Sequence, residues 1–369
     1  VITTLDNGGA ERMLVELVRH KPDVCAGVAV LKSNGKFLPL MKETGIPVLE
    51  VGLTSNPMSA LNIVKLIRFL RSQKPDIVQG WMYHADLVAM IALLCSGLRK
   101  TTKLAWGIRC SDMDLSKYSF VLRAIVRICA LLSRFSDIVI ANSSAGYESH
   151  KKVGYNPPNF SVVHNGIDVQ KFLFDPVKRD KLKADLNIPE SHRVFIHTAR
   201  VDPMKNHAGL LEAFSHLKNA TLILIGSGTE NLPEQQNVIP LGVRQDVPDL
   251  LNIGDFIVLS SDFGEGFPNA LAEGMATGLA PISTDVGDTR EIIGNTGWVI
   301  PSKNSTILQQ TLEHALEIPI DELTYRKNRA AIRIQQNFTI DKAYSNFQDA
   351  YNRVFQETSS EKTKNQIWK

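Results

Sequence analysis

Short apolar runs alternate with amphipathic stretches along nearly the whole of this 369-residue chain. Clear runs lie at 1–5, 28–32, 103–108, 137–141, 193–198 and 255–259. Stretches with a helical period separate them. Continuous apolar runs are typical of parallel strands, because helices cover both faces of such a sheet. The alternation therefore predicts an α/β fold built on parallel sheets.

The alternation is interrupted by a polar stretch rich in Lys and Asp that contains Pro176 and Pro189. The chain is also long for one hydrophobic core. We predict two Rossmann-like domains that face a cleft. The expected boundaries are 1–165 for the first domain, 166–190 for a linker, 191–335 for the second domain, 336–357 for a final helix and 358–369 for a tail.

Charge is divided unevenly between the two halves. Residues 1–165 hold 20 Lys or Arg against 12 Asp or Glu, a balance of +8 in a chain of net charge +3. The remainder therefore carries −5. A basic first half predicts an anionic partner, and both nucleic acid and an anionic membrane surface fit that description.

The four cysteines stand far apart, at Cys25, Cys95, Cys110 and Cys129. Without a C-x-x-C spacing they indicate neither a zinc site nor a disulfide framework. No apolar run approaches the roughly 20 residues that span a bilayer. These features are typical of a protein of the reducing cytoplasm.

Two glutamates, Glu265 and Glu273, frame the run G-E-G-F-P-N-A-L-A-E-G, which follows an apolar strand and opens a helix near Pro268. Their spacing of eight predicts that both project from the start of that one helix. Unpaired backbone N–H groups at a helix start attract an anion. Carboxylates beside them can accept hydrogen bonds from vicinal sugar hydroxyls. This combination suits a nucleotide sugar. The simpler alternative is one Glu that caps the helix and a second that faces solvent.

Two cations, Arg200 and Lys205, follow the strand predicted at 193–198 and precede a helix. Ligands of parallel α/β sheets bind at this edge. There the two cations could neutralise a departing diphosphate. Unless other residues join them, a pair of surface cations explains the pattern equally well. A third loop, with Gly8 and Gly9, could approach a phosphate closely but lacks the G-x-G-x-x-G spacing of dinucleotide folds.

The run from Gly264 to Gly278 resembles the signature of the family-4-type retaining glycosyltransferases, whose fold is called GT-B. The G-G-A-E-R segment at 8–12, the N-G-I-D turn at 165–168 and the loops at 226–228 and 241–246 are similar to further segments of that family. The resemblance extends over nearly the whole chain in the right order.

The resemblance implies roles for these residues. Glu265 would hold the transferred sugar, Glu273 the ribose, and Arg200 and Lys205 the diphosphate. The last helix would cross back to pack on the first domain. The other implied donor-binding residues are Gly8, Gly9, Gly228, Val243, Arg244, Gly266, Phe267, Pro268, Asn269 and Ala270.

The chain departs from the family at Arg109, where many members place a histidine near the reacting sugar. Arg109 could bind an acceptor phosphate or the sugar, or it could pair with Asp112 or Asp114. His84 and Asn165 are further candidates on the acceptor side, although a lone histidine such as His84 is more often structural.

Two other features allow two interpretations each. Asp112-Met113-Asp114 has the D-x-D form of a metal site, but cations and helix ends already neutralise the diphosphate, so we expect a loop feature and no metal or cofactor. The stretch 118–135 combines apolar residues with Arg123, Arg127 and Arg134. It could lie on an anionic membrane or be a core helix with solvated arginines.

The expected function is retaining transfer of a hexose-type sugar from a nucleotide sugar, UDP-linked, to a saccharide or polyprenyl-linked acceptor in cell-surface polysaccharide synthesis. The expected location is the cytoplasm, with possible contact at the inner face of its membrane. Two alternatives stay open. One is a sugar-nucleotide 2-epimerase of the same architecture, and the other is a nucleic-acid-binding protein, although the basic residues are scattered rather than clustered with aromatics.

Overall fold

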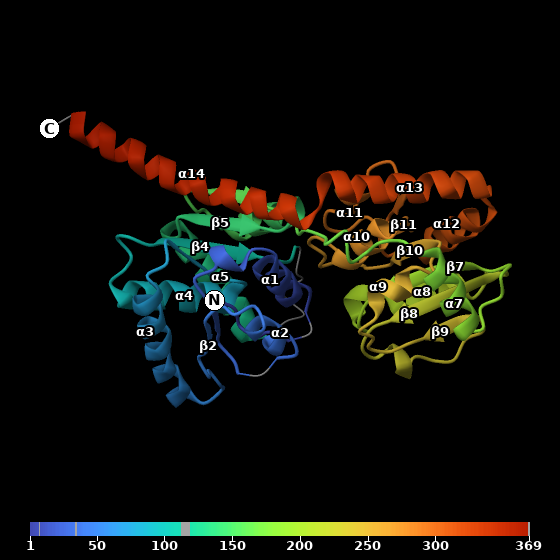
Figure 1. Ribbon diagram of the computed structural model, residues 1–369, viewed down its shortest axis with the longest axis horizontal. Coiled ribbons are helices and arrows are strands. Elements are labelled where there is room, and N and C mark those ends of the chain that lie inside the picture. Colours follow the sequence, from blue (N-terminus) through green and yellow to red (C-terminus); the bar gives the residue numbers. More distant parts are fainter. Residues whose placement is uncertain (7, 34, 112–118, 368–369) are drawn as a thin grey trace. The chain divides into compact units, whose positions relative to one another are not determined.

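The computed structural model describes residues 1–6, 8–33, 35–111 and 119–367, and from residue 357 onward it describes the backbone alone. The chain forms two compact units. The first unit comprises Val1–Gly166 and Ile340–Lys369, and the second unit comprises Ile167–Thr339. Each unit contains parallel sheet (Figure 1).

The first unit has a two-stranded and a four-stranded sheet among its described residues, both parallel. Ile2 bridges to both Val30 and Trp81 and so connects the two sheets. The two-stranded sheet pairs β1 (Val28–Val30) with β2 (Val48–Glu50). The four-stranded sheet runs in the order β3 (Ile77–Gln79), β4 (Lys103–Ile108), β5 (Ile138–Ala141) and β6 (Phe160–Val162).

Helices cover both faces of the four-stranded sheet, so there is a hydrophobic core on each face. Side chains along β4 and β5 point alternately into these two cores. Leu104, Trp106 and Val139 face α3, α4 and α5, whereas Ala105 and Ile138 face α1, α2 and α14. The helices of the unit are α1 (Gly9–His20), α2 (Leu38–Lys42), α3 (Ile63–Gln73), α4 (Tyr83–Ser96), α5 (Phe120–Leu132), α6 (Ser144–Val153) and α14 (Ile340–Ile367), with short 3-10 turns η1 (Pro22–Val24), η2 (Pro57–Asn62) and η4 (Ser133–Phe135).

The second unit has one six-stranded parallel sheet in the order β12-β11-β10-β7-β8-β9. From β7 to β9, each strand is therefore added on the same side of the one before it. β10 then pairs with the opposite side of β7, and β11 and β12 follow outward from β10. Such a reversal is a topological switch point, where ligands bind beyond the carboxyl ends of the strands. The strands are β7 (Arg193–Thr198), β8 (Ala220–Ile225), β9 (Val238–Pro240), β10 (Phe256–Leu259), β11 (Ala280–Thr284) and β12 (Trp298–Ile300).

Two apolar cores sandwich this second sheet. Ile196 and Ile257 pack on one side against α10 and α13, and Phe195 and Phe256 pack on the other against α8 and α12. The helices are α7 (Pro176–Asp185), α8 (His207–Phe214), α9 (Val247–Leu251), α10 (Asn269–Ala276), α11 (Thr289–Ile293), α12 (Ser305–Glu317) and α13 (Ile320–Asn337), with short turns η5 (Pro203–Lys205) and η6 (Thr229–Asn231).

The predicted α/β class with two parallel, Rossmann-like units is confirmed, and so is a C-terminal helix that packs on the first half. That helix, α14, contacts α1 and β5 of the first unit. In the described part of the chain, no helix combines the length and the apolar character needed to cross a bilayer.

Three segments differ from the sequence-based expectation. Of the expected linker, 166–190, residues 167–190 include α7 and belong to the second unit. The final helix begins at Ile340 rather than 336, because α13 continues to Asn337 and ends there. Residues 1–5, read as a strand, form single bridges at Ile2.

Candidate functional site

The loop that follows β7 is shaped by two capping side chains. Asp202 accepts a hydrogen bond from the Met204 N–H at 2.9 Å and starts the turn η5. Asn206 has a left-handed backbone (φ 51°) and caps α8 through the Gly209 N–H at 3.0 Å. Asn is one of the few non-glycine residues that adopts this conformation readily. Lys205 therefore lies on a short, fixed turn between the strand and the helix.

This loop is bound to the loop that follows β10. The Asp262 N–H donates to the Met204 carbonyl at 2.8 Å, and the Ser260 hydroxyl donates to the Lys205 carbonyl at 2.9 Å. β7 and β10 are neighbours in the sheet, on the two sides of the switch point. The two loops thus form one structure at the carboxyl edge of the sheet.

Lys205 and Glu265 meet across this edge. The Lys205 Nζ donates to the Glu265 Oε1 at 2.5 Å, and the Ser261 hydroxyl donates to the same oxygen at 2.6 Å. The Lys205 side chain is 16% exposed and that of Glu265 is 8% exposed. A largely buried ion pair is costly to desolvate and adds little to stability. Its position suggests that these charges serve a ligand.

Glycines bring the neighbouring loops together. At Gly287 (φ 58°) a Cβ would lie 2.4 Å from the Gly266 carbonyl oxygen, and the Asp288 N–H donates to that oxygen at 3.0 Å. At Gly226 (φ 145°) a Cβ would lie 2.2 Å from the Ala199 carbonyl oxygen. The loops after β7, β8, β10 and β11 therefore contact one another closely at one edge.

The two glutamates do not share a helix, contrary to the sequence-based expectation. Glu265 lies in the loop before α10, where Gly264 has φ 79°, and Glu273 lies within the helix. Pro268 is the residue before the helix rather than its first residue. Both glutamates are buried, with 6% and 5% of their surface exposed.

Other predicted donor residues occupy the same edge. Arg200 is exposed and pairs with Asp202 at 3.3 Å. Arg244 pairs with Asp246 at 2.5 Å, and Val243 is exposed beside it. Gly228 lies against Val201, Phe267 packs on Phe338, and Gly266, Asn269 and Ala270 surround the start of α10.

Sequence reasoning missed two contributors to this edge. One is Ser261, which orients Glu265. The other is His197 of β7, which is fully buried and donates through Nδ1 to the Val258 carbonyl of β10 at 2.9 Å. Burial is the largest cause that lowers the pKa of His197 to about 3, and the nearby His207 is the second. The His197 ring therefore stays neutral. It connects the two strands that flank the switch point.

The remaining candidates belong to the first unit. Gly8 precedes α1 and Gly9 is the first residue of that helix. His84 lies in the first turn of α4, and partial burial of its ring, together with the charge of Lys32, lowers its pKa. Asn165 is buried shortly after β6.

Arg109, at the carboxyl end of β4, packs against two aromatic rings. Its guanidinium carbon lies 3.7 Å from the centre of the Trp81 ring and 5.3 Å from that of Phe347 of α14. Burial lowers its pKa to about 9. No described residue accepts a hydrogen bond from its guanidinium. Asp112 and Asp114 were expected either to pair with Arg109 or to form a D-x-D motif. Both residues lie outside the described residues.

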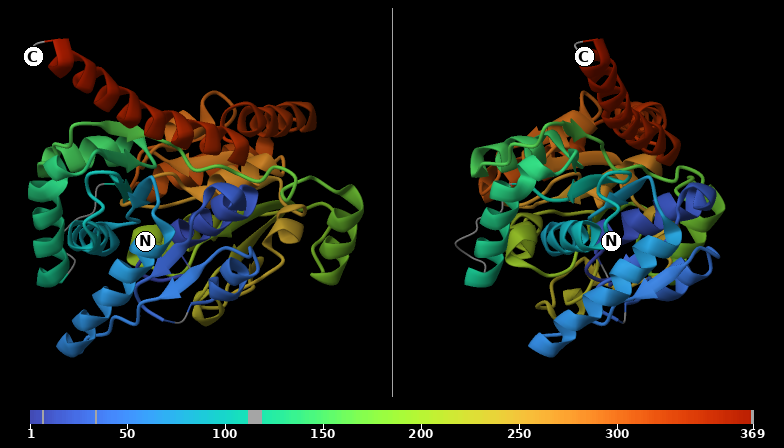
Figure 2. Two further views of the ribbon diagram at one scale, coloured as in Figure 1. Left: turned by 60° about the vertical axis from the view of Figure 1, so that its left-hand side comes forward. Right: turned by 90° about the vertical axis from the view of Figure 1, so that its left-hand side faces the viewer.

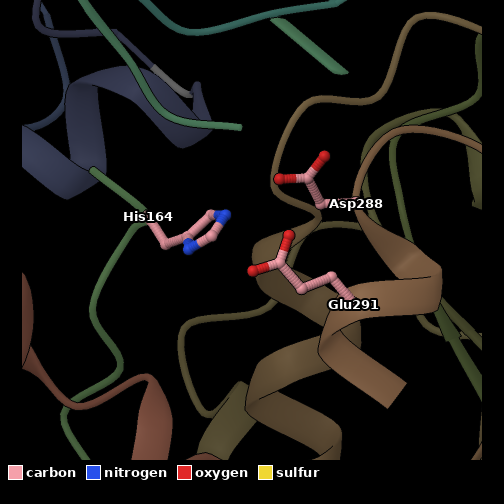
Figure 3. Close-up of side chains that lie close together, drawn as sticks. All are labelled: His164, Asp288 and Glu291. Atoms are coloured by element: carbon pink, nitrogen blue, oxygen red, sulfur yellow. The ribbon is translucent and has the colours of Figure 1, made fainter. Parts of the chain in front are cut away.

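Two further features are separate from the Lys205–Glu265 pair. Asp288 and Glu291, at the start of α11, turn their carboxylates to the same side (Figure 3). His164, also labelled there, belongs to the first unit, whereas the two acids belong to the second unit. A cavity of about 590 Å³ lies within the first unit, lined by residues of α1, α3, β1, β3 and α14. None of the donor-edge residues lines it.

Comparison with known proteins connects this architecture to one family. Residues 7–171 match the model described as Glycosyltransferase Family 4, and residues 192–317 match that of Glycosyl transferases group 1. A putative glycosyltransferase, EpsF, of Bacillus subtilis is 34% identical over 77% of this chain and 78% of its own length.

Two other relatives have more specific names. The N-acetyl-alpha-D-glucosaminyl L-malate synthase of Bacillus anthracis is 30% identical, and the match covers 62% of each chain. An N-acetylgalactosaminyltransferase of Campylobacter jejuni, named for a diacetylbacillosaminyl-diphospho-undecaprenol substrate, is 25% identical over 90% of this chain and 93% of its own.

Solved structures share the fold. HepE of Anabaena in complex with UDP-glucose superposes with a TM-score of 0.81, at 22% identity, over 97% of this chain and 98% of its own. At this level of identity the similarity establishes the two-domain GT-B fold.

Proposed function

Because the chain belongs to glycosyltransferase family 4, the glycosyl transferases of group 1, we propose that it moves a hexose-type sugar from a nucleoside-diphosphate sugar to a saccharide or lipid-linked saccharide acceptor. The observation that carries this proposal is the Lys205–Glu265 pair at the switch point of the second sheet. It offers a cation for a phosphate and a carboxylate for sugar hydroxyls side by side.

The donor would occupy the carboxyl edge of the second sheet. Lys205 and Arg200 would neutralise the diphosphate, Glu265 would accept hydrogen bonds from the hexose, and Glu273 would hold the ribose. Arg200 must leave Asp202 to do so, which costs little because the pair is exposed. We propose UDP as the carrier, supported by the similar HepE structure with UDP-glucose.

The proposed reaction retains the configuration of the anomeric carbon. The bond from that carbon to the diphosphate oxygen breaks first, and Lys205 and Arg200 stabilise the negative charge that develops on the leaving group. The acceptor hydroxyl then bonds to the same face of the oxocarbenium-like sugar, and its proton passes to the departing phosphate. We propose that no metal ion takes part, because the two cations already supply positive charge.

The acceptor would be bound by the first unit, and we propose His84, Arg109 and Asn165 as its contacts and Gly8 and Gly9 as further donor contacts. Arg109 can take part only if the side chains that bury it move. A lipid-linked saccharide in surface-polysaccharide synthesis is supported by the Campylobacter jejuni relative, whose name includes an undecaprenol-linked substrate. The reaction would then take place at the cytoplasmic face of the membrane.

Incubation of the protein with a panel of nucleotide sugars tests the proposal. We expect slow release of UDP from one donor, faster release when a matching acceptor is added, and no loss of rate when EDTA is present. Formation of an epimer without release of nucleotide would instead identify a 2-epimerase. No turnover together with tight oligonucleotide binding would identify a nucleic-acid-binding protein.

Replacing Glu273 with glutamine should weaken UDP binding about tenfold. The amide keeps the size of the side chain but loses the charge that strengthens a hydrogen bond to the ribose. Titration calorimetry measures the affinity, and Glu291→Gln, an exposed acid on α11, is the matched control. Unchanged affinity in Glu273→Gln would mean that this carboxylate serves only the helix.

A further inference from the structure

The outer surface of α3, α4 and α5 is unusual among the surfaces of the first unit. α3 packs on α4, and α4 packs on α5, so the three helices form one layer over the sheet. α5, in blue-green, runs along the outside of the unit (Figure 2). We call the exposed side chains of residues 57–75, 83–103 and 119–135 the α3–α5 face.

This face is rich in exposed apolar side chains. Among the described residues, 20 large hydrophobic side chains are exposed, and 10 of them lie on the α3–α5 face although it is a small part of the chain. They are Met58, Leu61, Val64, Ile91, Leu94, Phe120, Val121, Ile128, Leu131 and Phe135. Such a concentration marks a surface that contacts something apolar.

Helix α5 shows the pattern most clearly. Val126, Cys129 and Ala130 face the core of the unit, as in any packed helix. On the opposite side, Phe120 is 75% exposed and Leu131 is 64% exposed. An ordinary core helix, whose outer side carries solvated arginines alone, would not expose these apolar side chains. The structure therefore favours the surface-binding interpretation of this segment over the ordinary core helix.

The same face carries almost only positive charge. Its three segments contain 10 Lys or Arg and one acid, Asp86, which is fully buried. Arg99 and Lys103 pair with Asp137. Among the described residues, the other eight form no ion pair: Lys65, Arg68, Arg71, Lys74, Lys100, Arg123, Arg127 and Arg134. The face therefore combines apolar surface with uncompensated cations.

We propose that the α3–α5 face docks on the surface of an anionic lipid membrane. Apolar side chains such as Phe120 and Leu131 would enter the boundary between headgroups and acyl chains, and the surrounding cations would contact lipid phosphates. A second copy of this chain fits less well, because two identical faces would bring like charges together. Nucleic acid would leave the aliphatic side chains without an apolar partner.

The inference deepens the proposed function, because a lipid-linked acceptor would lie in the same membrane. It does not depend on that function, since membrane binding can be measured without any reaction. Failure to bind lipid and failure to transfer sugar are therefore separate results.

Co-sedimentation with vesicles tests the proposal. The full chain should bind vesicles of equal parts phosphatidylcholine and phosphatidylglycerol at least about tenfold more tightly than vesicles of phosphatidylcholine alone. Raising the salt from about 0.1 M to about 1 M shortens the screening length from about 10 Å to about 3 Å and should weaken binding strongly. Equal affinity for both vesicles, or none for either, would overturn the proposal.

Two double variants test the residues. Arg127→Glu with Arg134→Glu should weaken binding to the anionic vesicles about tenfold or more, and Phe120→Ser with Leu131→Ser should do so too. Matched controls in the second unit are Lys181→Glu with Lys218→Glu, and Tyr325→Ser with Ile332→Ser, all exposed there.

Circular dichroism and thermal denaturation verify that each variant is folded. If the face variants bind as wild type does, or if the controls lose as much, the face is not the docking surface. Sedimentation velocity tests the remaining alternative, that the α3–α5 face binds a second copy of this chain. A concentration-dependent dimer that the face variants abolish would identify a protein interface instead and would also refute the proposal.

Discussion

Replacing Lys205 with alanine should lower kcat for sugar transfer about 10²- to 10³-fold while the protein remains folded. The Lys205 Nζ is fixed at the carboxyl edge of the second sheet by a turn that two caps define. A cation held in place there meets the charge of a departing diphosphate without reorganisation. The loss should appear mainly in kcat, because this charge develops in the transition state.

The same substitution removes one partner of a nearly buried ion pair, so its structural cost must be separated from its chemical cost. Glu265 keeps its hydrogen bond from Ser261. We therefore expect a loss of stability of about 1–3 kcal/mol, the cost of an unsatisfied buried group, rather than unfolding. Thermal denaturation measures this loss on the same preparation.

Lys327→Ala is the matched control. The Lys327 Nζ lies 3.5 Å from the Asp255 Oδ1, and the two side chains are 19% and 10% exposed. Asp255 precedes β10, at the amino edge of the same sheet, and retains Arg179 at 2.8 Å. Stability should fall by a similar amount, but kcat should not. Wild-type transfer by Lys205→Ala, or an equal loss of kcat in Lys327→Ala, would refute the role of Lys205.

The strands were predictable because most are buried on both faces. Residues 193–198 and 103–108 form β7 and β4 with the predicted bounds, since helix-covered parallel strands read as continuous apolar runs. β12 (Trp298–Ile300), at the edge of the sheet, was missed because its apolar run is three residues long. α13 (Ile320–Asn337) was missed as well, because its many charged residues conceal its apolar stripe.

The residues of the candidate site could be predicted from the sequence, but the contacts between them could not. Lys205 and Glu265 are 60 positions apart, and their pairing depends on β10 returning to lie beside β7. A pattern of apolar runs does not determine strand order. Placing Glu265 and Glu273 on one helix start failed for a local reason: Gly264 has φ 79°, so the chain is not helical before α10.

Ser261 and His197 show a second reason for the missed contacts. Neither residue has a motif of its own, and each acts through a partner that the fold provides. Ser261 hydrogen-bonds Glu265, and His197 hydrogen-bonds the backbone of β10. Their roles follow from tertiary structure alone.

Gly287→Ala should destabilise the second unit by about 3 kcal/mol. A left-handed backbone costs a non-glycine residue about 1–2 kcal/mol, and overpacking adds about 1–3 kcal/mol. Both apply here, because Gly287 has φ 58° and an added Cβ would lie 2.4 Å and 2.5 Å from the carbonyl oxygens of Gly266 and Glu265. For a unit of this size, the thermal midpoint should fall by roughly 6–12 °C.

The same contact should transmit the substitution to the site. The added methyl group displaces the backbone of Glu265, whose carboxylate must stay within hydrogen-bond reach of Lys205. Transfer measured well below the new midpoint should therefore fall too, although no ligand-binding side chain has changed. Calorimetry and the transfer assay on one preparation give both quantities.

Gly278→Ala separates strain from crowding. Gly278 also has a left-handed backbone, at φ 89°, but a Cβ there would meet nothing within 4 Å. The Gly278→Ala variant should lose about 1–2 kcal/mol of stability, the cost of the left-handed backbone alone, and keep the wild-type transfer rate. If both variants lose the same stability and both keep the wild-type rate, the close packing of the loops after β10 and β11 does not position Glu265.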